Sequence, residues 1–588
     1  MENFPVEWQL EKYFYSGLSD PQRKQDFEDY KQQCESFIKK YKGKIGIIKT
    51  DQEFFEFLEE CDVLDNLMTK YGMYLGFLSS LDTQNQIIQK EDAKLNKFLS
   101  DNYESFLFVE EEYKQIGYDA LMKFSESDLL KPYKNSIIES ANDLKYQLSE
   151  AEERVYIKLS SGNNLFEELV TSFEFLFRGK KKSEDEIRML RENADRDIRK
   201  EAFQILANMY LNKQNQITFG NLYSAVCKSN IADIELRKYP TVMSQRNISE
   251  QVSDQAVNSL LANTTNAYSL YHKFLEKKRQ LLKLDKMKLY DVFAPVNFFG
   301  DDAEDGIFTF EEGWKLYKDA IKDVDPLLSE YSDKMLYEGR ISVYPKSGKT
   351  SGAYANYAQT IPSFVLLNWA NSRGDVTTLA HELGHAFHGE LSKIQKDAVY
   401  STPLTLAETA SIFNETLMFE ALLESLQDDN EKKELILNRL DDIFGTIFRQ
   451  VTYVSFEKKC HESFLKNEPL TFDDYNSMWL EEMKKLYGPD VEINDDMIKA
   501  GWSMIPHIFH TPFYCYTYAF GNIISLNIYE NYKNAEDKKE FIAKYHKLLS
   551  AGGSDTPENL LNNIFGIKFD ETFYSTAFSH IEKLINKL

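Results

Sequence analysis

The sequence predicts a large, mainly α-helical protein. Its 588 residues include only 14 prolines and 25 glycines, the two residue types that most strongly disfavour helices. Over long stretches, apolar residues recur at helical spacing between charged ones. A chain of this length exceeds a single hydrophobic core, so we expect at least two domains or lobes. We place the boundary near residue 200, with a helical N-terminal domain over residues 1–200 and a second domain over residues 201–588.

In the N-terminal domain, residues 51–170 are predicted to be almost entirely helical. The clearest helical patterns cover residues 51–71 and 150–158. The glycine and three lysines at residues 179–182 predict a solvated loop, and a further helix is expected to begin at Ser183.

In the second domain, three glycines within residues 339–352 predict a hairpin or a mobile loop. Residues 363–369 are an apolar run that predicts a short strand. Two helices are expected next, over residues 376–389 and 404–424, and the second follows a proline, which favours helix entry. A turn is predicted over residues 551–557.

The helix predicted over residues 376–389 carries the pattern H-E-x-x-H at His381, Glu382 and His385. A spacing of four places both histidines on one helical face, where both imidazoles can reach one tetrahedral zinc ion. Glu382 then stands where it can hold a zinc-bound water and take its proton. Histidine is scarce, nine in 588, so accidental matches are expected in only about one in a hundred such chains. The pattern predicts a zinc peptidase with one Zn²⁺ per chain.

A catalytic zinc needs a third protein ligand, and the sequence offers three candidates. His388 lies on nearly the same helical face, but one straight helix rarely supplies three ligands to a tetrahedral ion. Glu408 and Glu415 lie seven residues apart on the next predicted helix and share a face. We expect Glu408 to ligate the metal, and Glu415 and His388 to lie around the ligands, with Glu415 orienting a ligating histidine.

Five segments resemble the oligoendopeptidase F family, which is related to thimet oligopeptidase. They are residues 349–354, 363–369, 381–388, 407–415 and 507–518. The resemblance implies a large helical peptidase of the zincin type, with a small β-sheet beside the active-site helix and a deep substrate channel between two lobes. It also implies cleavage of short peptides at internal bonds, with residues 201–588 as the catalytic metallopeptidase domain.

The segment over residues 507–518 is rich in histidine and tyrosine. In the family, such residues lie over the zinc, where neutral donors stabilise the oxyanion of peptide hydrolysis. We therefore expect His510 to be catalytic together with at least one of Tyr514 and Tyr518. The alternative is an aromatic core segment, which is plausible in a chain with 35 tyrosines and 41 phenylalanines.

The strand predicted over residues 363–369 ends shortly before the H-E-x-x-H pattern. An exposed edge there could bind a peptide backbone by strand addition, and the glycine-rich segment before it could close over the channel. The alternative is a purely structural strand. The residues expected to contact the substrate are Gly352, Ala353, Tyr354, Phe364, Val365 and His507.

Composition argues against several classes of partner. With 69 Lys plus Arg against 94 Asp plus Glu, the formal charge is −25, which disfavours nucleic acid. No run of 18 apolar residues is present, so no membrane span is expected. The first residues show no signal-peptide pattern and the five cysteines are scattered, so we expect a cytoplasmic protein.

Together these patterns predict a zinc-dependent endopeptidase that hydrolyses short, unstructured oligopeptides with metal-activated water. Two alternatives remain at this stage. One is a carboxypeptidase or dipeptidase on the same scaffold, which would need a positive group for the substrate terminus. The other is a peptide-binding protein without catalysis, for which Glu382 would have no chemical purpose.

Overall fold

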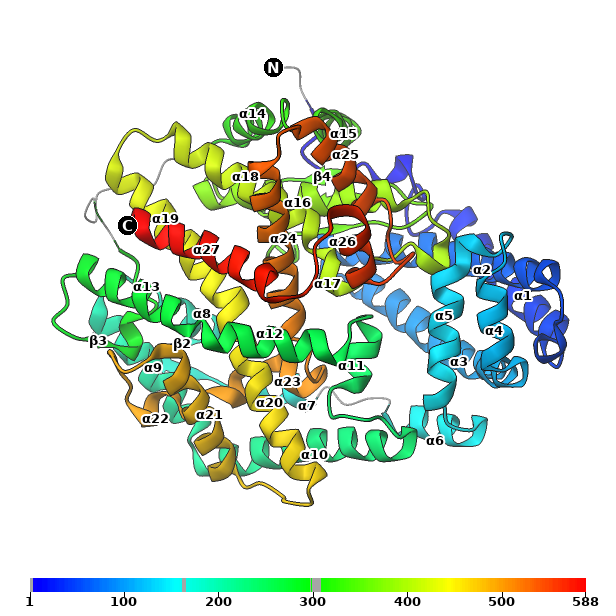
Figure 1. Ribbon diagram of the computed structural model, residues 1–588, viewed down its shortest axis with the longest axis horizontal. Helices are drawn as coiled ribbons and strands as arrows, with labels where there is room; N and C mark the ends of the chain where they lie inside the picture. Colours follow the sequence, from blue (N-terminus) through cyan, green and yellow to red (C-terminus); the bar gives the residue numbers. More distant parts are fainter. Residues whose placement is uncertain (1–3, 161–164, 297, 299–307) are drawn as a thin grey trace.

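Helices dominate the computed structural model of this chain, which describes residues 4–160, 165–296, 298 and 308–588. The strands within these ranges are short (Figure 1). The predicted mainly helical fold is therefore confirmed. None of the helices in the described ranges is long and apolar enough to cross a membrane.

The first helices form a separate group, coloured blue to cyan in Figure 1. They pack around a buried cluster whose members lie between Tyr30 and Ala141. The helices predicted over residues 51–71 and 150–158 are confirmed as parts of α2 and α6. The group consists of α1 (Pro21–Tyr41), α2 (Asp51–Leu81), α3 (Gln86–Ile116), α4 (Tyr118–Ser125), α5 (Lys134–Asp143) and α6 (Glu150–Ser160).

The loop predicted over residues 179–182 is wrong. Strand β2 (Lys180–Lys182) pairs antiparallel with β1 (Phe175–Phe177). Arg178 and Gly179 between them have φ of 47° and 79°, the left-handed backbone that a two-residue hairpin turn requires. The predicted helix start is confirmed, because the Ser183 side chain caps α8 (Glu184–Leu190).

The other helices surround one large buried cluster. Phe166, in α7, already belongs to it, so the domain boundary at residue 200 stays a proposal. The turn predicted over residues 551–557 is confirmed up to the start of α26. These helices are α7 (Leu165–Thr171), α9 (Arg196–Tyr210), α10 (Lys213–Arg237), α11 (Ser244–Ser249), α12 (Asp254–Asn266), α13 (Tyr268–Leu281), α14 (Phe310–Ile321), α15 (Pro326–Tyr337), α16 (Arg373–Ser392), α17 (Leu404–Ala407), α18 (Thr409–Ser425), α19 (Asp429–Ile443), α20 (Arg449–Leu465), α21 (Phe472–Tyr487), α22 (Asp495–Ile498), α23 (Pro506–His510), α24 (Tyr516–Asn534), α25 (Lys538–Leu549), α26 (Pro557–Phe565) and α27 (Glu571–Lys587).

A small sheet lies beside α16. Its strands are β4 (Ile341–Ser342), β5 (Tyr354–Asn356) and β6 (Phe364–Leu366), in the order β4-β6-β5. A second, two-stranded parallel sheet joins β3 (Met287–Lys288) and β7 (Val491–Glu492). The strand predicted over residues 363–369 is thus confirmed in its centre. However, β6 pairs in parallel with β4 and antiparallel with β5, so its edges are occupied and strand addition to it is wrong.

The glycine-rich segment between β4 and β5 is a loop held against the end of α2. The Thr83 amide donates a hydrogen bond to the Gly348 carbonyl at 2.7 Å, and the Thr350 amide donates to the Ser80 carbonyl at 2.8 Å. The loop prediction is confirmed, whereas its mobility stays a prediction. Through these bonds the N-terminal helices support the sheet beside α16.

Candidate metal centre and catalytic residues

The helix α16 begins at a capping box formed by Ser372 and Asp375. It packs closely against α18, and Gly384 makes this approach possible. A Cβ atom at Gly384 would lie 2.6 Å from the carbonyl oxygen of Ala410, which is closer than atoms can pack. Only glycine therefore lets α18 cross here and bring Glu408, at its N-terminal end, opposite the histidines of α16.

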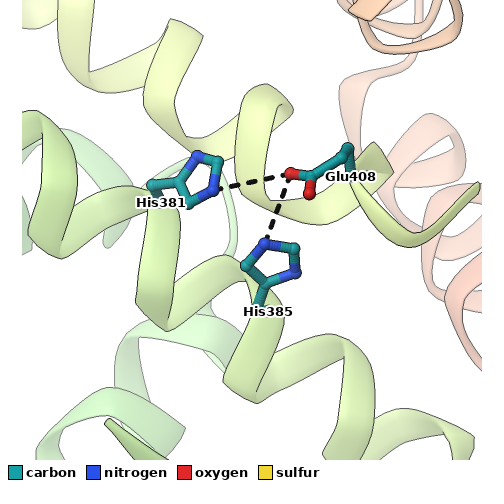
Figure 2. A group of neighbouring side chains, drawn as sticks. All are labelled: His381, His385 and Glu408. Carbon is teal, nitrogen blue, oxygen red and sulfur yellow. Dashed lines mark ion pairs between the residues drawn. The ribbon is translucent and has the colours of Figure 1, made fainter. Parts of the chain in front are cut away.

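His381, His385 and Glu408 form a compact group of possible metal ligands (Figure 2). Oε2 of Glu408 lies 3.5 Å from Nε2 of His381 and 3.3 Å from Nε2 of His385. The three ligand atoms all lie within 4.8 Å of one another. Two imidazole nitrogens and one carboxylate oxygen, converging on one point, are a donor set that fits a divalent metal.

Neighbouring side chains fix the orientation of these ligands. Nδ1 of His381 lies 3.0 Å from Oε2 of Glu415, so Nε2 is the nitrogen that faces Glu408. Glu415 is held in turn by an ion pair with Arg439. The Ser411 hydroxyl donates to Oε2 of Glu408 at 2.7 Å. The structure thus places Glu415 behind a histidine and Glu408 among the ligand atoms.

The carboxylates of the group suit a bound cation, and a metal would have to displace the proton of His381 in order to bind there. Burial alone would lower the pKa of His381, but its hydrogen bond with Glu415 and the charges of Glu415 and Glu408 raise it to about 9. Burial would raise the pKa of Glu408, but the hydrogen bond with His385 and the charges of both histidines lower it to about 2. The carboxylates therefore concentrate negative charge where a cation would sit.

Glu382 lies beside the ligand group and is only 6% exposed. Burial raises the pKa of its carboxyl group, while the charges of His381 and His385 oppose that rise. A glutamate whose pKa is raised toward neutrality is a more effective general base. A backbone hydrogen bond from Ala355, in β5, lowers the pKa of this carboxyl group. Strand β5 therefore runs past the prospective base.

His388 lies outside the group of possible ligands. Its Nε2 is 3.1 Å from the Thr402 hydroxyl, and burial lowers the pKa of the imidazole to about 4. A neutral, buried histidine here supports the segment that leads to Glu408.

His507, Tyr514 and Tyr518 form an aromatic group next to the ligands. The Tyr518 hydroxyl is 3.4 Å from Nε2 of His507, and the Tyr514 ring lies parallel to the His507 ring at 5.6 Å. Burial and the nearby Tyr514 raise the pKa of Tyr518, and the Glu408 charge adds to the rise. One turn later in α24, a Cβ atom at Gly521 would lie 3.0 Å from Cβ of Glu408. Helix α24 therefore brings Tyr518 close to Glu408, one of the possible metal ligands.

His510 has a different environment. Its Nε2 forms an ion pair with Glu167 of α7, and its ring packs edge-on against Phe166 at 5.5 Å. The expected catalytic role of His510 therefore needs correction, since the histidine that contacts Tyr518 is His507.

Two of the expected substrate contacts are wrong. Phe364 and Val365 are 0% exposed, and Phe364 packs against Trp8 and Phe77 in the core. Side chains buried in this way cannot meet a substrate.

The segment before β6 remains closer to the surface. The Gly352 carbonyl accepts a hydrogen bond from Asn368 at 2.7 Å, and Ala353 is partly buried. The Tyr354 hydroxyl donates to Ser80 at 2.8 Å. Tyr354 therefore connects the sheet to α2.

Tyr357, just after β5, was not predicted from the sequence. Burial raises the pKa of its hydroxyl to about 12, with the charges of Glu408 and Glu382 adding to the rise. Its ring fills the space beside Gly389, where a Cβ atom would lie 2.3 Å from Cγ of Tyr357. Tyr357 is one of 35 tyrosines and lies outside the patterned segments, so no sequence signal marks it.

The profile of peptidase family M3 matches residues 189–579, more than half of the chain. The chain belongs to peptidase family M3. Group B oligopeptidase PepB from Streptococcus agalactiae is 27% identical over 545 residues, 88% of this chain and 86% of its own length. Chromosomal oligoendopeptidase F from Lactococcus lactis subsp. cremoris is 30% identical over 406 residues, 68% of this chain and 65% of its own length. The predicted resemblance to oligoendopeptidase F is confirmed.

Solved structures agree with this assignment at the level of the fold. The crystal structure of oligoendopeptidase-F from Enterococcus faecium has a TM-score of 0.72 at 22% identity, covering 96% of this chain and 98% of that one. PZ peptidase A, solved with an inhibitor, also has a TM-score of 0.72, at 20% identity and coverage of 96% and 97%. This M3 peptidase therefore has the fold of solved oligoendopeptidases.

Proposed function

We propose that this M3 peptidase is a zinc-dependent endopeptidase that hydrolyses internal bonds of short oligopeptides. The observation that carries the proposal is the convergence of His381, His385 and Glu408, with Glu382 buried beside them. The curated relatives it resembles are named oligopeptidases and oligoendopeptidases, which agrees with this substrate class. One Zn²⁺ per chain and a cytoplasmic location belong to the same proposal, with no nucleic-acid partner.

In this mechanism the three ligands hold the metal, and each remaining residue has a separate task. A bound zinc ion would polarise the peptide carbonyl and lower the pKa of the attacking water. The Glu382 carboxylate accepts a proton from that water and gives it to the nitrogen of the leaving amine. The Tyr518 hydroxyl donates a hydrogen bond to the developing oxyanion, and His507 orients this hydroxyl.

Strand β5 provides the place where an extended peptide would bind. It is an edge strand, since β6 pairs with only one of its sides, and its Ala355 backbone lies close enough to Glu382 to affect the ionisation of the carboxyl group. A peptide added to this edge would use backbone hydrogen bonds and make few demands on its own sequence. Strand addition is therefore proposed at the free edge of β5 and not at β6.

Replacing Tyr518 by phenylalanine is expected to lower kcat by about 100-fold or more, as loss of an oxyanion donor does elsewhere. Zinc content and KM should change little, because the hydroxyl acts on the transition state. His510→Ala is the matched control and should keep most of the wild-type kcat. Fluorescence assays of a quenched peptide measure kcat and KM for both variants. A large loss of kcat in His510→Ala with a small one in Tyr518→Phe would return the catalytic role to His510.

The substrate class is tested with a ladder of unstructured peptides blocked at both ends. Peptides of about five to twenty residues, a few strand lengths, should be cleaved at internal bonds. Folded proteins should stay intact because they cannot present an extended segment to β5. Mass spectrometry identifies the bonds. Cleavage only of peptides with a free terminus would instead establish the carboxypeptidase or dipeptidase alternative, and binding without cleavage would establish the non-catalytic one.

A further inference from the structure

A cavity of about 290 Å³ is lined in part by His507. Its walls come from α8, α9, α20 and α21 and from the segment before α23. It adjoins a second cavity, with which it shares Phe293 and Arg449, and the second shares Asn438 and Asp442 with a third that reaches Glu415. The three cavities are therefore neighbours, and the third lies beside Glu415.

Two arginines in the wall of the first cavity, Arg191 and Arg449, form no ion pair with a carboxylate in the described part of the chain. Among the described residues, Arg191 makes one hydrogen bond, from its Nε to the Arg188 carbonyl at 3.4 Å, and no carboxylate pairs with it or with Arg449. Both guanidinium groups lie over the Phe293 ring, at 5.3 and 5.9 Å from its centre. The stacking holds the two groups in place without using their in-plane N–H donors.

Three acids, Glu192, Asp441 and Asp442, line the second cavity with Arg449, but within the described ranges none of them forms an ion pair with either arginine. Asp441 is 2.7 Å from Lys278. The charge of Asp441 also acts on Arg449, and that of Glu192 acts on Arg191, through space. Burial, together with the charges of Arg188 and Arg449, lowers the pKa of Arg191 to about 10, so it remains a cation at neutral pH. Two neighbouring cations in a partly buried cavity favour a bound anion.

We infer that this cavity binds a carboxylate of the peptide substrate, with Arg191 and Arg449 as its partners. The inference rests on the proposed peptidase function and adds a charge preference to it. Guanidinium groups match the planar geometry of a carboxylate. In a peptide, that carboxylate belongs either to the C-terminus or to an acidic side chain beyond the cleaved bond. A peptide whose backbone crosses the catalytic group would enter this cavity past His507.

The test measures KM for three internally quenched peptides of one sequence: a free C-terminal acid, its amide, and the amide with one glutamate near that end. The free acid should have a KM about 10-fold or more below that of the amide, the range of a charge-assisted hydrogen bond. If only the glutamate peptide has a lowered KM, the cavity binds an acidic side chain and not the C-terminal carboxylate. In Arg191→Gln and Arg449→Gln, the difference should shrink to near unity.

The matched control is Arg188→Gln. Arg188 lines the same cavity, but it is paired with Glu184, so its loss should leave the preference in place. A purely structural role for Arg191 or Arg449 would change kcat or thermal stability equally for all peptides. Equal KM values for the three peptides on the wild-type enzyme would overturn the inference without needing any variant. Failure to cleave any of them would count against the peptidase proposal instead.

Discussion

Replacing Glu382 by glutamine is expected to lower kcat by at least about 100-fold while zinc stays bound. Glutamine keeps the shape of the side chain and leaves the three ligands intact, but it cannot accept a proton from the attacking water. Glu382 is buried beside the possible ligands, so the glutamine would stand in the same place without a carboxylate to take the proton. Turnover of a quenched peptide gives kcat, and elemental analysis of the same sample gives the zinc content.

The matched control for this variant is Glu390→Gln. Glu390 lies on the same helix and is paired with Lys393 at 2.8 Å, so its replacement should leave kcat close to the wild-type value. Near-normal turnover in Glu382→Gln would show that the proton goes elsewhere and would remove Glu382 from the mechanism.

Replacing Glu408 by alanine should have the largest effect on metal binding. It removes one of the three proposed protein ligands, whereas Glu415→Ala removes the partner of Nδ1 of His381. For Glu415→Ala and for His388→Ala we expect zinc affinity to fall by about 10- to 100-fold, as when a residue behind a ligand is lost. The loss of zinc affinity in Glu408→Ala should exceed the losses in Glu415→Ala and His388→Ala. Competition with a chromophoric chelator gives the three affinities on one scale.

The opposite ranking would contradict the ligand set. If His388→Ala strips the metal and Glu408→Ala keeps it, then the third ligand is on α16. The packing of Gly384 against α18 offers a separate check. Gly384→Ala should displace Glu408 from the histidines and weaken zinc binding, because the added Cβ would meet the Ala410 carbonyl.

The parts of the site that follow from local spacing were predictable from the sequence. His381 and His385 are one helical turn apart, so a correct helix prediction places both side chains on one face. Glu408 needed a second helix, but that helix follows closely in the chain, and Glu408 is the first acid in it. The helical class followed from composition and periodicity in the same way.

The parts that depend on distant segments were not predictable. His507 and His510 are three residues apart in the sequence, and the pairing of His510 with Glu167 of α7 distinguishes them. Strand β6 looked free because nothing local shows that β4 and β5 both pair with it, or that the Trp8 indole donates to the Val365 carbonyl at 2.8 Å. The cationic cavity likewise joins Arg191 and Arg449 from remote helices.

The most direct test of the central claim is a zinc titration of the metal-free enzyme during cleavage of one peptide blocked at both ends. Cleavage at an internal bond should be absent without metal, rise linearly with added zinc and stop rising at one zinc per chain. The Glu382→Gln variant should bind the same single zinc without gaining activity. Undiminished cleavage in enzyme that elemental analysis shows to be free of metal would contradict the account.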